Sequence, residues 1–303
     1  MSSKKSILVG IDYSPPSINA LREAARIANA CDLSLICYHV LDQDILADFQ
    51  SHEAYDENGI LEFAYEKIET FICDVIGTAH DIEAFVNIGN PFLETLKLIK
   101  EHNPETLVLG SRGFGTIVPH TVGALASKCV RKAPVEVLLI RKDQDKPFHA
   151  IIACIDFSDN SIRAAHRAAE IARQDGAQLR LVHIYRPPIY ADSDIGWLGP
   201  AFPMIQEPSI IDDISNRLER LGYDLGKEYD LQDLSTVVHR YPSVTKGLYE
   251  SSKEMNADLI VLGTRGRTGF RTLYLGTTAE SLIHGTPCST LAVKPEGFTY
   301  SLD

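Results

Sequence analysis

The feature that most constrains this chain is an internal repeat. The segment ILVGIDYS at residues 7–14 recurs as IIACIDFS at residues 151–158, at an offset of 144 residues. Further along, LVLGSRG at residues 107–113 recurs as IVLGTRG at residues 260–266, now at an offset of 153. Self-similarity at a long period indicates that one folding unit occurs twice. The chain is therefore expected to fold as two tandem copies of the same architecture.

The length of 303 residues suits two domains of about 150 residues each. We place the domains at residues 1–142 and 149–303, with a short polar linker at 142–148. The offset grows by nine residues between the second and the fourth expected strand of the second copy. The segment 186–204 is rich in proline and glycine, as loops are, and is the expected place of this insertion.

Each copy alternates short apolar runs, typical of buried strands, with segments whose apolar residues recur at helical spacing. In the second copy we expect helices after Ser158, over 210–225, and near Ser243–Met255 and Thr277–His284. The expected strands are Ala150–Ile155, Leu179–Ile184, Thr236–His239, Leu259–Leu262 and Ser289–Val293. Strands separated by helices predict right-handed crossovers and a parallel sheet. The fold class is α/β: two tandem copies of a five-stranded, mostly parallel, Rossmann-like sheet flanked by helices.

The duplication also predicts how the copies meet. Single copies of such a fold would associate through the same surface on each, around a two-fold axis. The last strands, Val135–Ile140 and Ser289–Val293, should lie at sheet edges whose unpaired backbone groups need a partner. We expect these two strands to pair around a pseudo-two-fold axis.

Charge and composition exclude some functions. The net charge of −12 argues against non-specific binding to nucleic acid or to anionic membranes, which need basic patches. No apolar run reaches ~18 residues, and no signal-peptide pattern follows the two lysines near the start. The six cysteines form no CxxC pair and mostly sit in apolar runs, as reduced thiols do. We expect a cytoplasmic protein.

The most informative segment is a glycine loop in the second copy. Gly263 and Gly266 follow an apolar strand, and nine residues later Gly276, Thr277 and Thr278 begin an expected helix. Glycine lets the backbone approach an anion closely. A helix N-terminus offers free N–H groups and the positive end of its dipole, and threonine adds hydroxyl donors. This spacing indicates a phosphate site.

The alternative is a tight strand-to-helix turn, which two glycines alone would favour. Arg265, Arg267 and Arg271 lie within the same loop and make it the most basic stretch of an acidic domain, which favours phosphate. The loop matches neither the Walker A pattern, whose lysine is missing, nor G-x-G-x-x-G.

The loop resembles the ATP-binding signature of the universal stress protein family: glycine, two residues, glycine, nine residues, glycine, then serine or threonine. Gly263, Gly266, Gly276 and Thr277 match it, and the resemblance extends over both halves. It implies a tandem-type member with an adenine nucleotide alpha hydrolase-like fold. It also implies that Asp156 lies at the nucleoside and that the backbone of Ile184 meets adenine.

The first copy departs from this signature. Gly110, Gly113 and Gly123 are present, as are Asp12 and Val40, the counterparts of Asp156 and Ile184. However, alanine stands at position 124 where serine or threonine is expected, and phenylalanine and valine stand at 114 and 118 where the second copy has arginines. We interpret the first copy as a weaker second site.

Two residue pairs have alternative interpretations. His39 and His183 end the second strands, but no carboxylate or cysteine lies at ligand spacing, so packing is favoured over metal binding. Asp12 and Asp156 resemble general bases, yet no partner acid or nucleophile accompanies them, so a binding or capping role is favoured over catalysis. We therefore assign no catalytic or metal-ligating residue.

Three functions remain compatible with the sequence. The favoured one is a non-enzymatic stress-response regulator that binds ATP (or ADP or AMP), with or without Mg²⁺, mainly in its second half. The others are a slow ATPase and a nucleotide-free interaction scaffold. The expected partners are the adenine nucleotide, an unidentified protein, and a second copy of the tandem chain in a homodimer.

Overall fold

The computed structural model describes residues 5–43, 57–77, 82–112, 122–141, 146–187, 207–266 and 276–300. Both halves alternate strands with helices. The N-terminal half contains β1 (Ser6–Gly10), α1 (Pro15–Cys31), β2 (Ser34–Asp42), α3 (Glu57–Ile76), β3 (Ile82–Gly89), α4 (Pro91–His102), β4 (Thr106–Gly110), α5 (Ala124–Lys132) and β5 (Glu136–Ile140). The C-terminal half contains β6 (Ala150–Cys154), α6 (Asp159–Asp175), β7 (Gln178–Tyr185), α7 (Glu207–Tyr229), β8 (Leu234–Arg240), α8 (Val244–Glu254), β9 (Leu259–Gly263), α9 (Thr277–Gly285) and β10 (Ser289–Val293). Among the described helices, none combines the length and the apolar character that a membrane span requires.

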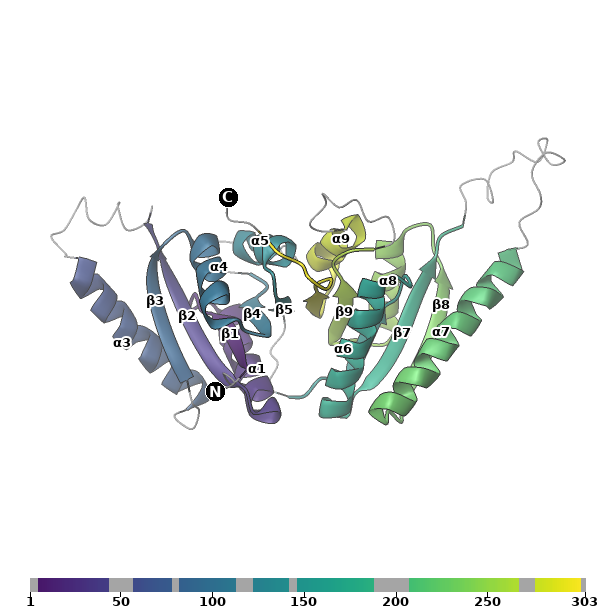
Figure 1. Ribbon diagram of the computed structural model, residues 1–303, viewed down its shortest axis with the longest axis horizontal. Helices are drawn as coiled ribbons and strands as arrows, with labels where there is room; N and C mark the ends of the chain where they lie inside the picture. The colour runs from purple at the N-terminus through teal and green to yellow at the C-terminus, as the bar shows by residue number, and fades with distance from the viewer. Residues whose placement is uncertain are drawn as a thin grey trace, which may run out of the picture.

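The strands form one continuous sheet in the order β3-β2-β1-β4-β5-β10-β9-β6-β7-β8. Within each half the neighbouring strands are parallel, and only the central β5–β10 pair is antiparallel among the described strands. The halves lie side by side, with α3 and α7 at the outer ends (Figure 1). The expected α/β fold and the duplication are confirmed.

The central strand pair has the symmetry that the repeat predicts. Leu138 of β5 pairs with Leu291 of β10, and these two residues are equivalent at the repeat offset of 153. On either side, Leu139 pairs with Thr290 and Val137 pairs with Ala292. A residue that pairs with its own counterpart lies on the pseudo-two-fold axis. The predicted pairing of the last strands is confirmed.

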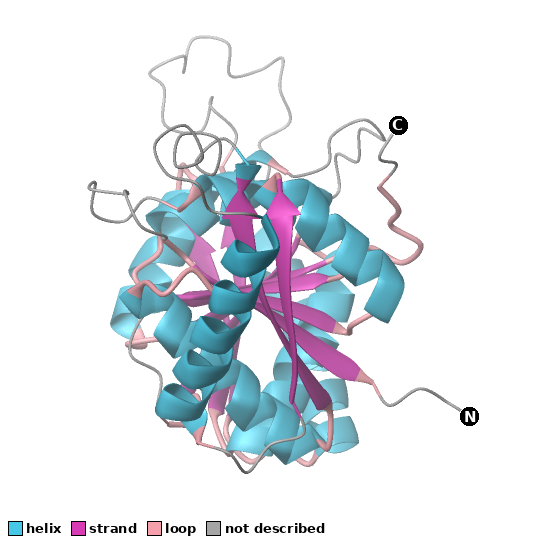
Figure 2. Ribbon diagram, turned by 90° about the vertical axis from the view of Figure 1, so that its left-hand side faces the viewer, coloured by secondary structure: helices cyan, strands magenta, loops and turns pink. Residues whose placement is uncertain are grey.

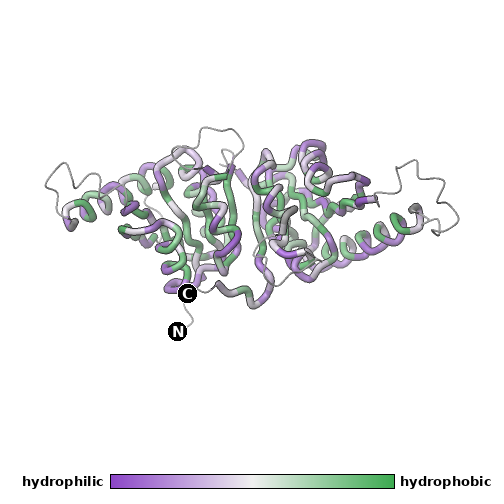
Figure 3. Tube along the Cα trace, turned by 90° about the horizontal axis from the view of Figure 1, so that it is seen from above, coloured by the Kyte–Doolittle hydropathy of each residue, from purple (hydrophilic) through white to green (hydrophobic). Residues whose placement is uncertain are grey.

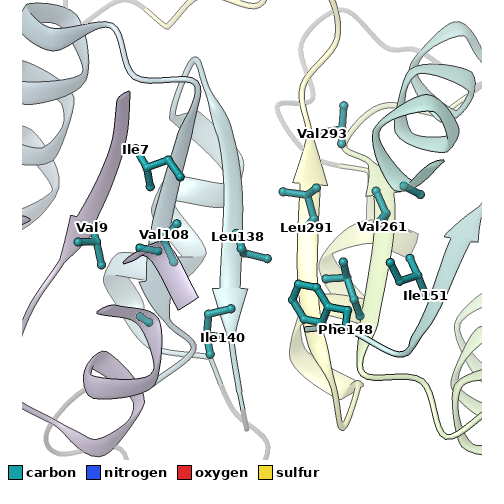
Figure 4. Packing of buried hydrophobic residues seen from close by; sticks show 14 of the residues in the cluster. Ile7, Val9, Val108, Leu138, Ile140, Phe148, Ile151, Val261, Leu291 and Val293 are labelled. Carbon is teal, nitrogen blue, oxygen red and sulfur yellow. The ribbon is translucent and has the colours of Figure 1, made fainter. Parts of the chain in front are cut away.

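Helices cover both faces of the twisted sheet (Figure 2). One apolar core lies under α1, α3, α6 and α7, and a second lies under α4, α5, α8 and α9. Apolar residues run along the strands, whereas the outer helices alternate polar and apolar segments (Figure 3). Both cores contain residues of β5 and of β10. In the first core, Leu138 and Ile140 of β5 face Leu291 and Val293 of β10 (Figure 4). The halves therefore share their hydrophobic cores.

The linker and the insertion differ from expectation in detail. Phe148, at the end of the expected polar linker, is 1% exposed and belongs to the first core. The strand β8 starts two residues before its expected beginning at Thr236. Its start is offset by 152 residues from that of β3, and the helix cap Ser243 is offset by 153 from Asn90. Eight of the nine extra residues thus enter between β7 and β8, where the 186–204 segment lies, and the ninth enters after β8.

Two basic side chains that follow the central strands anchor each half to the last helix of the other. Arg141, after β5, donates a hydrogen bond to the backbone carbonyl of Ile283 in α9. Its counterpart Lys294, after β10, donates to the backbone carbonyl of Val130 in α5. Lys294 is 5% exposed, and burial lowers the pKa of its amine to about 7. The two helices that begin at the glycine loops are thus fixed across the interface.

Two of the loop glycines pack a helix against a strand. A Cβ at Gly263 would lie 2.7 Å from the Asn160 Nδ2 atom and 3.0 Å from the Asn160 carbonyl carbon, at the start of α6. A Cβ at Gly110 would lie 2.8 Å from the carbonyl carbon of Pro16, at the equivalent point of α1. Glycine at these positions permits the helix to approach the end of the strand.

The buried amine of Lys294 predicts a pH-dependent difference in stability. Between about pH 7 and its ordinary pKa of 10.5, the unfolded chain holds a proton that the folded chain has released. The free energy of unfolding, measured relative to a Lys294→Met variant, should therefore rise with pH over this window. The rise is up to about 1.4 kcal/mol per pH unit, and there is none below pH 7. Urea denaturation of both proteins from pH 6 to 9 measures this rise. Arg141→Met is the control: the difference in free energy of unfolding between it and wild type should not change with pH, because arginine remains protonated. Parallel pH profiles for Lys294→Met and wild type would contradict the assignment.

The glycine contacts predict that similar substitutions destabilise the protein to different degrees. Gly263→Ala and Gly110→Ala should each lower the free energy of unfolding by about 1–3 kcal/mol, because the added methyl meets backbone atoms. Gly276→Ala should cost less than about 1 kcal/mol, because the nearest atom to its Cβ, the Thr264 carbonyl oxygen, is 3.6 Å away. Chemical denaturation measures all three. Equal destabilisation at Gly263 and Gly276 would show that the packing role is wrong.

Candidate functional site

The loop after the first strand of each half has the same strained geometry. Asp156 accepts hydrogen bonds at Oδ1 from the Ser158 backbone N–H (2.9 Å) and hydroxyl (2.5 Å). Asp12 does the same with Ser14, at 3.0 and 2.5 Å. Between them, Phe157 and Tyr13 adopt φ values of 60° and 61°, which are unusual for bulky residues. Backbone strain that recurs in both copies indicates that each loop is held to present its aspartate at the end of the strand.

In each half, a histidine of the neighbouring strand forms a hydrogen bond to the backbone at the start of this loop. His183 Nδ1 lies 2.7 Å from the carbonyl oxygen of Ile155, and His39 Nδ1 lies 2.8 Å from that of Ile11. A carbonyl oxygen only accepts, so Nδ1 carries the proton in both rings. Burial lowers the pKa of His39, which keeps its ring neutral at pH 7. Both rings also contact the strained aromatic residues, so packing explains them, and the described residues contain no group of three or more metal-ligating side chains.

A cavity of about 260 Å³ opens at the carboxyl ends of the C-terminal strands, between β6 and β9. This is the point where the strand order reverses, which is where open α/β sheets bind ligands. Six of the residues predicted from the sequence line it together: Asp156, Ile184, Gly263, Arg265, Gly266 and Gly276. Thr277 and Thr278 begin α9 at its edge, although their side chains lie outside the described residues, as do Arg267 and Arg271.

The three glycines of this loop have different surroundings. Gly263 serves the packing of α6. A Cβ at Gly266 would lie 2.7 Å from Asp156 Oδ2, so Gly266 lets the loop close over the aspartate. Only Gly276 borders the cavity with no close protein contact, since its Cβ would meet nothing nearer than 3.6 Å. Gly276 is therefore the glycine whose missing side chain leaves room for a ligand.

The sequence predicts that Arg265 supplies positive charge to the glycine loop, but its guanidinium contacts a different part of the chain. Its guanidinium carbon is 5.4 Å from the centre of the Phe298 ring, in the tail that follows β10. The same ring lies 4.9 Å from the Lys294 amine. The charged end of Arg265 is thus engaged with the tail at the interface, while the residue as a whole still lines the cavity.

Sequence reasoning missed several lining residues. Ser161, Val182, Val244 and Leu248 contribute from α6, β7 and α8. Ser161 was detectable, because the spacing Ser158-x-x-Ser161 recurs as Ser14-x-x-Ser17. The apolar residues carry no such signal, since core residues of any helix or strand have the same pattern.

The N-terminal half has a second cavity, of about 520 Å³, at the equivalent switch point between β1 and β4. The predicted residues Asp12, Val40, Gly110 and Gly123 line it, and Gly113 lies outside the described residues. The sequence did not single out Tyr38, Asp42 and Pro91, which also line this cavity.

Each half of the chain is similar to the same family of known proteins. The family model for the universal stress protein family matches residues 4–141 and again residues 147–294. A universal stress protein of Mycolicibacterium smegmatis is 23% identical over 315 residues, with 97% of this chain and 98% of the relative covered. Universal stress protein Rv1996 of Mycobacterium tuberculosis is 27% identical over 304 residues, with 92% and 91% covered.

A solved structure shows the same fold. The crystal structure of a universal stress protein from Archaeoglobus fulgidus superposes with a TM-score of 0.67 at 19% identity, covering 96% of this chain and 99% of that one. The repeated fold, the two equivalent cavities and the two matches to one family model agree. This chain belongs to the universal stress protein family, as a tandem of two such domains.

Proposed function

We propose that this protein is an ATP-binding regulator of the stress response that holds its nucleotide mainly in the C-terminal cavity. The family assignment supports the broad role, and the residues around the β6–β9 switch point support the ligand. The proposal has three parts: where the phosphates lie, where the nucleoside lies, and why the two halves differ.

The start of α9 is the observation that carries the proposal. Among the helices whose N-caps are described, α1, α4, α6 and α8 are capped by the side chains of Ser14, Asn90, Ser158 and Ser243. Helices α9 and α5 instead begin at Gly276 and Gly123, which have no side chain to accept the first N–H groups. An uncapped helix N-terminus at a cavity is a ready site for an anion. The phosphates of ATP satisfy these donors at α9.

The remainder of the cavity suits a nucleoside. Asp156 provides a carboxylate at its edge that can accept hydrogen bonds from sugar hydroxyls. Apolar side chains of β7 and α8, Val182, Val244 and Leu248, offer a surface for the flat base beside Ile184. The described residues hold no metal-ligating cluster, so a Mg²⁺ ion accompanying the triphosphate would be held by its phosphate oxygens.

The N-terminal cavity is the weaker ATP site in this proposal. Thr277 offers a hydroxyl at the start of α9, where a hydrogen bond to a charged phosphate contributes roughly 1.5–3 kcal/mol. The counterpart at the start of α5 is Ala124, which offers none. Together with the loss of two loop arginines, the difference approaches a factor of about a hundred in affinity.

Replacing Gly276 tests the proposed site. Gly276→Val places a branched side chain at the cavity edge without meeting the core, so the protein should stay folded while its ATP affinity falls by about a hundredfold or more. Titration calorimetry measures the affinity, and the unfolding midpoint confirms the fold. The matched control is Gly123→Val in the N-terminal half, which should leave the tight ATP site unchanged.

Other outcomes discriminate between the remaining functions. Wild-type affinity in Gly276→Val with a loss in Gly123→Val would move the ATP site to the N-terminal half. No ATP binding, and no nucleotide in the ligand released from denatured purified protein, would favour a nucleotide-free scaffold. Multiple turnover of added ATP would favour an ATPase. That the tandem chain forms a homodimer and that it binds a protein partner are still predictions.

A further inference from the structure

The two cavities can be compared position by position, because the strand registers of the halves are equivalent. Gly10 pairs with Tyr38 in the N-terminal half, and Cys154 pairs with Val182 in the C-terminal half, both at the offset of 144. The elements that would hold a base and a sugar are retained: Asp12 and Val40 occupy the places of Asp156 and Ile184. The differences fall on the charge at the rim, on the helix start and on the floor.

The charged lining of the two cavities differs by one carboxylate. Asp42, the last residue of β2, lines the N-terminal cavity together with Asp12. Its counterpart after β7 is Arg186, which is exposed and does not line the C-terminal cavity. Two carboxylates and one cation, Arg112, are the charged residues that line the described part of the N-terminal cavity. This balance opposes a polyphosphate and favours a ligand without negative charge.

The helix start differs in polarity. Leu125, in the first turn of α5, lines the N-terminal cavity. The equivalent position in α9 is Thr278. Alanine and leucine at the start of α5 therefore replace the two hydroxyl-bearing residues that begin α9. The backbone N–H groups remain, but an apolar side chain stands at the place where phosphate oxygens would need donors.

The floor of the N-terminal cavity carries a hydrogen-bond acceptor that the other cavity lacks. The Tyr38 hydroxyl lies 2.7 Å from Thr95 Oγ1, and Thr95 donates its own proton to the Pro91 carbonyl (2.7 Å). Tyr38 must therefore donate to Thr95, which leaves its oxygen as an acceptor beside Gly10, where a Cβ would lie 3.0 Å away. The counterparts of Tyr38 and Thr95 are the apolar Val182 and Leu248.

We propose that the N-terminal cavity is a separate site for an uncharged nucleoside. The two carboxylates accept hydrogen bonds from sugar hydroxyls, the Tyr38 oxygen accepts from a base N–H, and the acidic rim weakens the binding of phosphates. The proposal rests on the proposed function in one respect: it treats the two cavities as copies of one nucleoside site. One chain would then hold a nucleotide and a nucleoside at the same time.

Native mass spectrometry of the full chain with saturating ATP and adenosine tests this inference. The expected complex contains one ATP and one adenosine. Calorimetry with each ligand alone should show that adenosine binds the N-terminal cavity about tenfold or more tightly than ATP does. Asp42→Arg, which installs the charge found at position 186, should weaken adenosine binding and add a second bound ATP. The matched control Arg186→Asp should leave adenosine binding unchanged.

The outcomes separate this inference from the proposed function. Two bound ATP molecules in the wild type when ATP and adenosine are present at equal concentrations, or no bound adenosine, would overturn the nucleoside site. Unchanged adenosine and ATP binding in folded Asp42→Arg would overturn the role of the acidic rim. One adenosine and no ATP would refute the proposed ATP function while supporting the nucleoside site. One bound ATP, with adenosine competing for the same site, would support the proposed ATP function and refute the separate nucleoside site.

Discussion

The antiparallel pairing of β5 with β10 is the constraint on which the rest of the molecule depends. It satisfies the backbone groups of two strands that would otherwise be exposed edges, and it joins two five-stranded sheets into one. Because Leu138 pairs with its own counterpart Leu291, the contact is self-complementary, as in a symmetric dimer. Tandem duplication has placed this interface within one chain, where the partner is always present.

The same interface positions the helices that border both cavities. Helices α5 and α9 begin at the cavities, and their later turns accept hydrogen bonds from Lys294 and Arg141 of the opposite half. An ion pair between Arg131 and Glu280 joins the two helices directly. The Phe298 ring contacts both Arg265 of the glycine loop and Lys294 of the interface. The geometry of each cavity therefore depends on the whole chain.

Duplication also allows the two sites to diverge while the fold is kept. The strained aspartate loops, the histidine hydrogen bonds and the packing glycines are the same in both halves, because each maintains the end of the sheet. Tyr38 and its counterpart Val182 line the two cavities where a ligand would be bound, and Asp42 lines the N-terminal one. The large side chain of Tyr38 fits only because its neighbour in the sheet is Gly10, whose missing side chain leaves room for the phenol.

The sequence by itself determined the duplication, the alternation of strands and helices, the pairing of the last strands and six of the residues that line the C-terminal cavity. These features are encoded locally, in apolar periodicity and in glycine spacing. Because the chain is duplicated, each pattern occurs twice and could be checked in the other copy. Only the tertiary structure decided the separate roles of Gly263 and Gly276, because whether a glycine meets a helix or an open cavity depends on residues far away in the chain. It also directed the Arg265 guanidinium to Phe298 and brought Asp42 to a cavity rim, since side-chain direction and long-range contacts leave no local pattern.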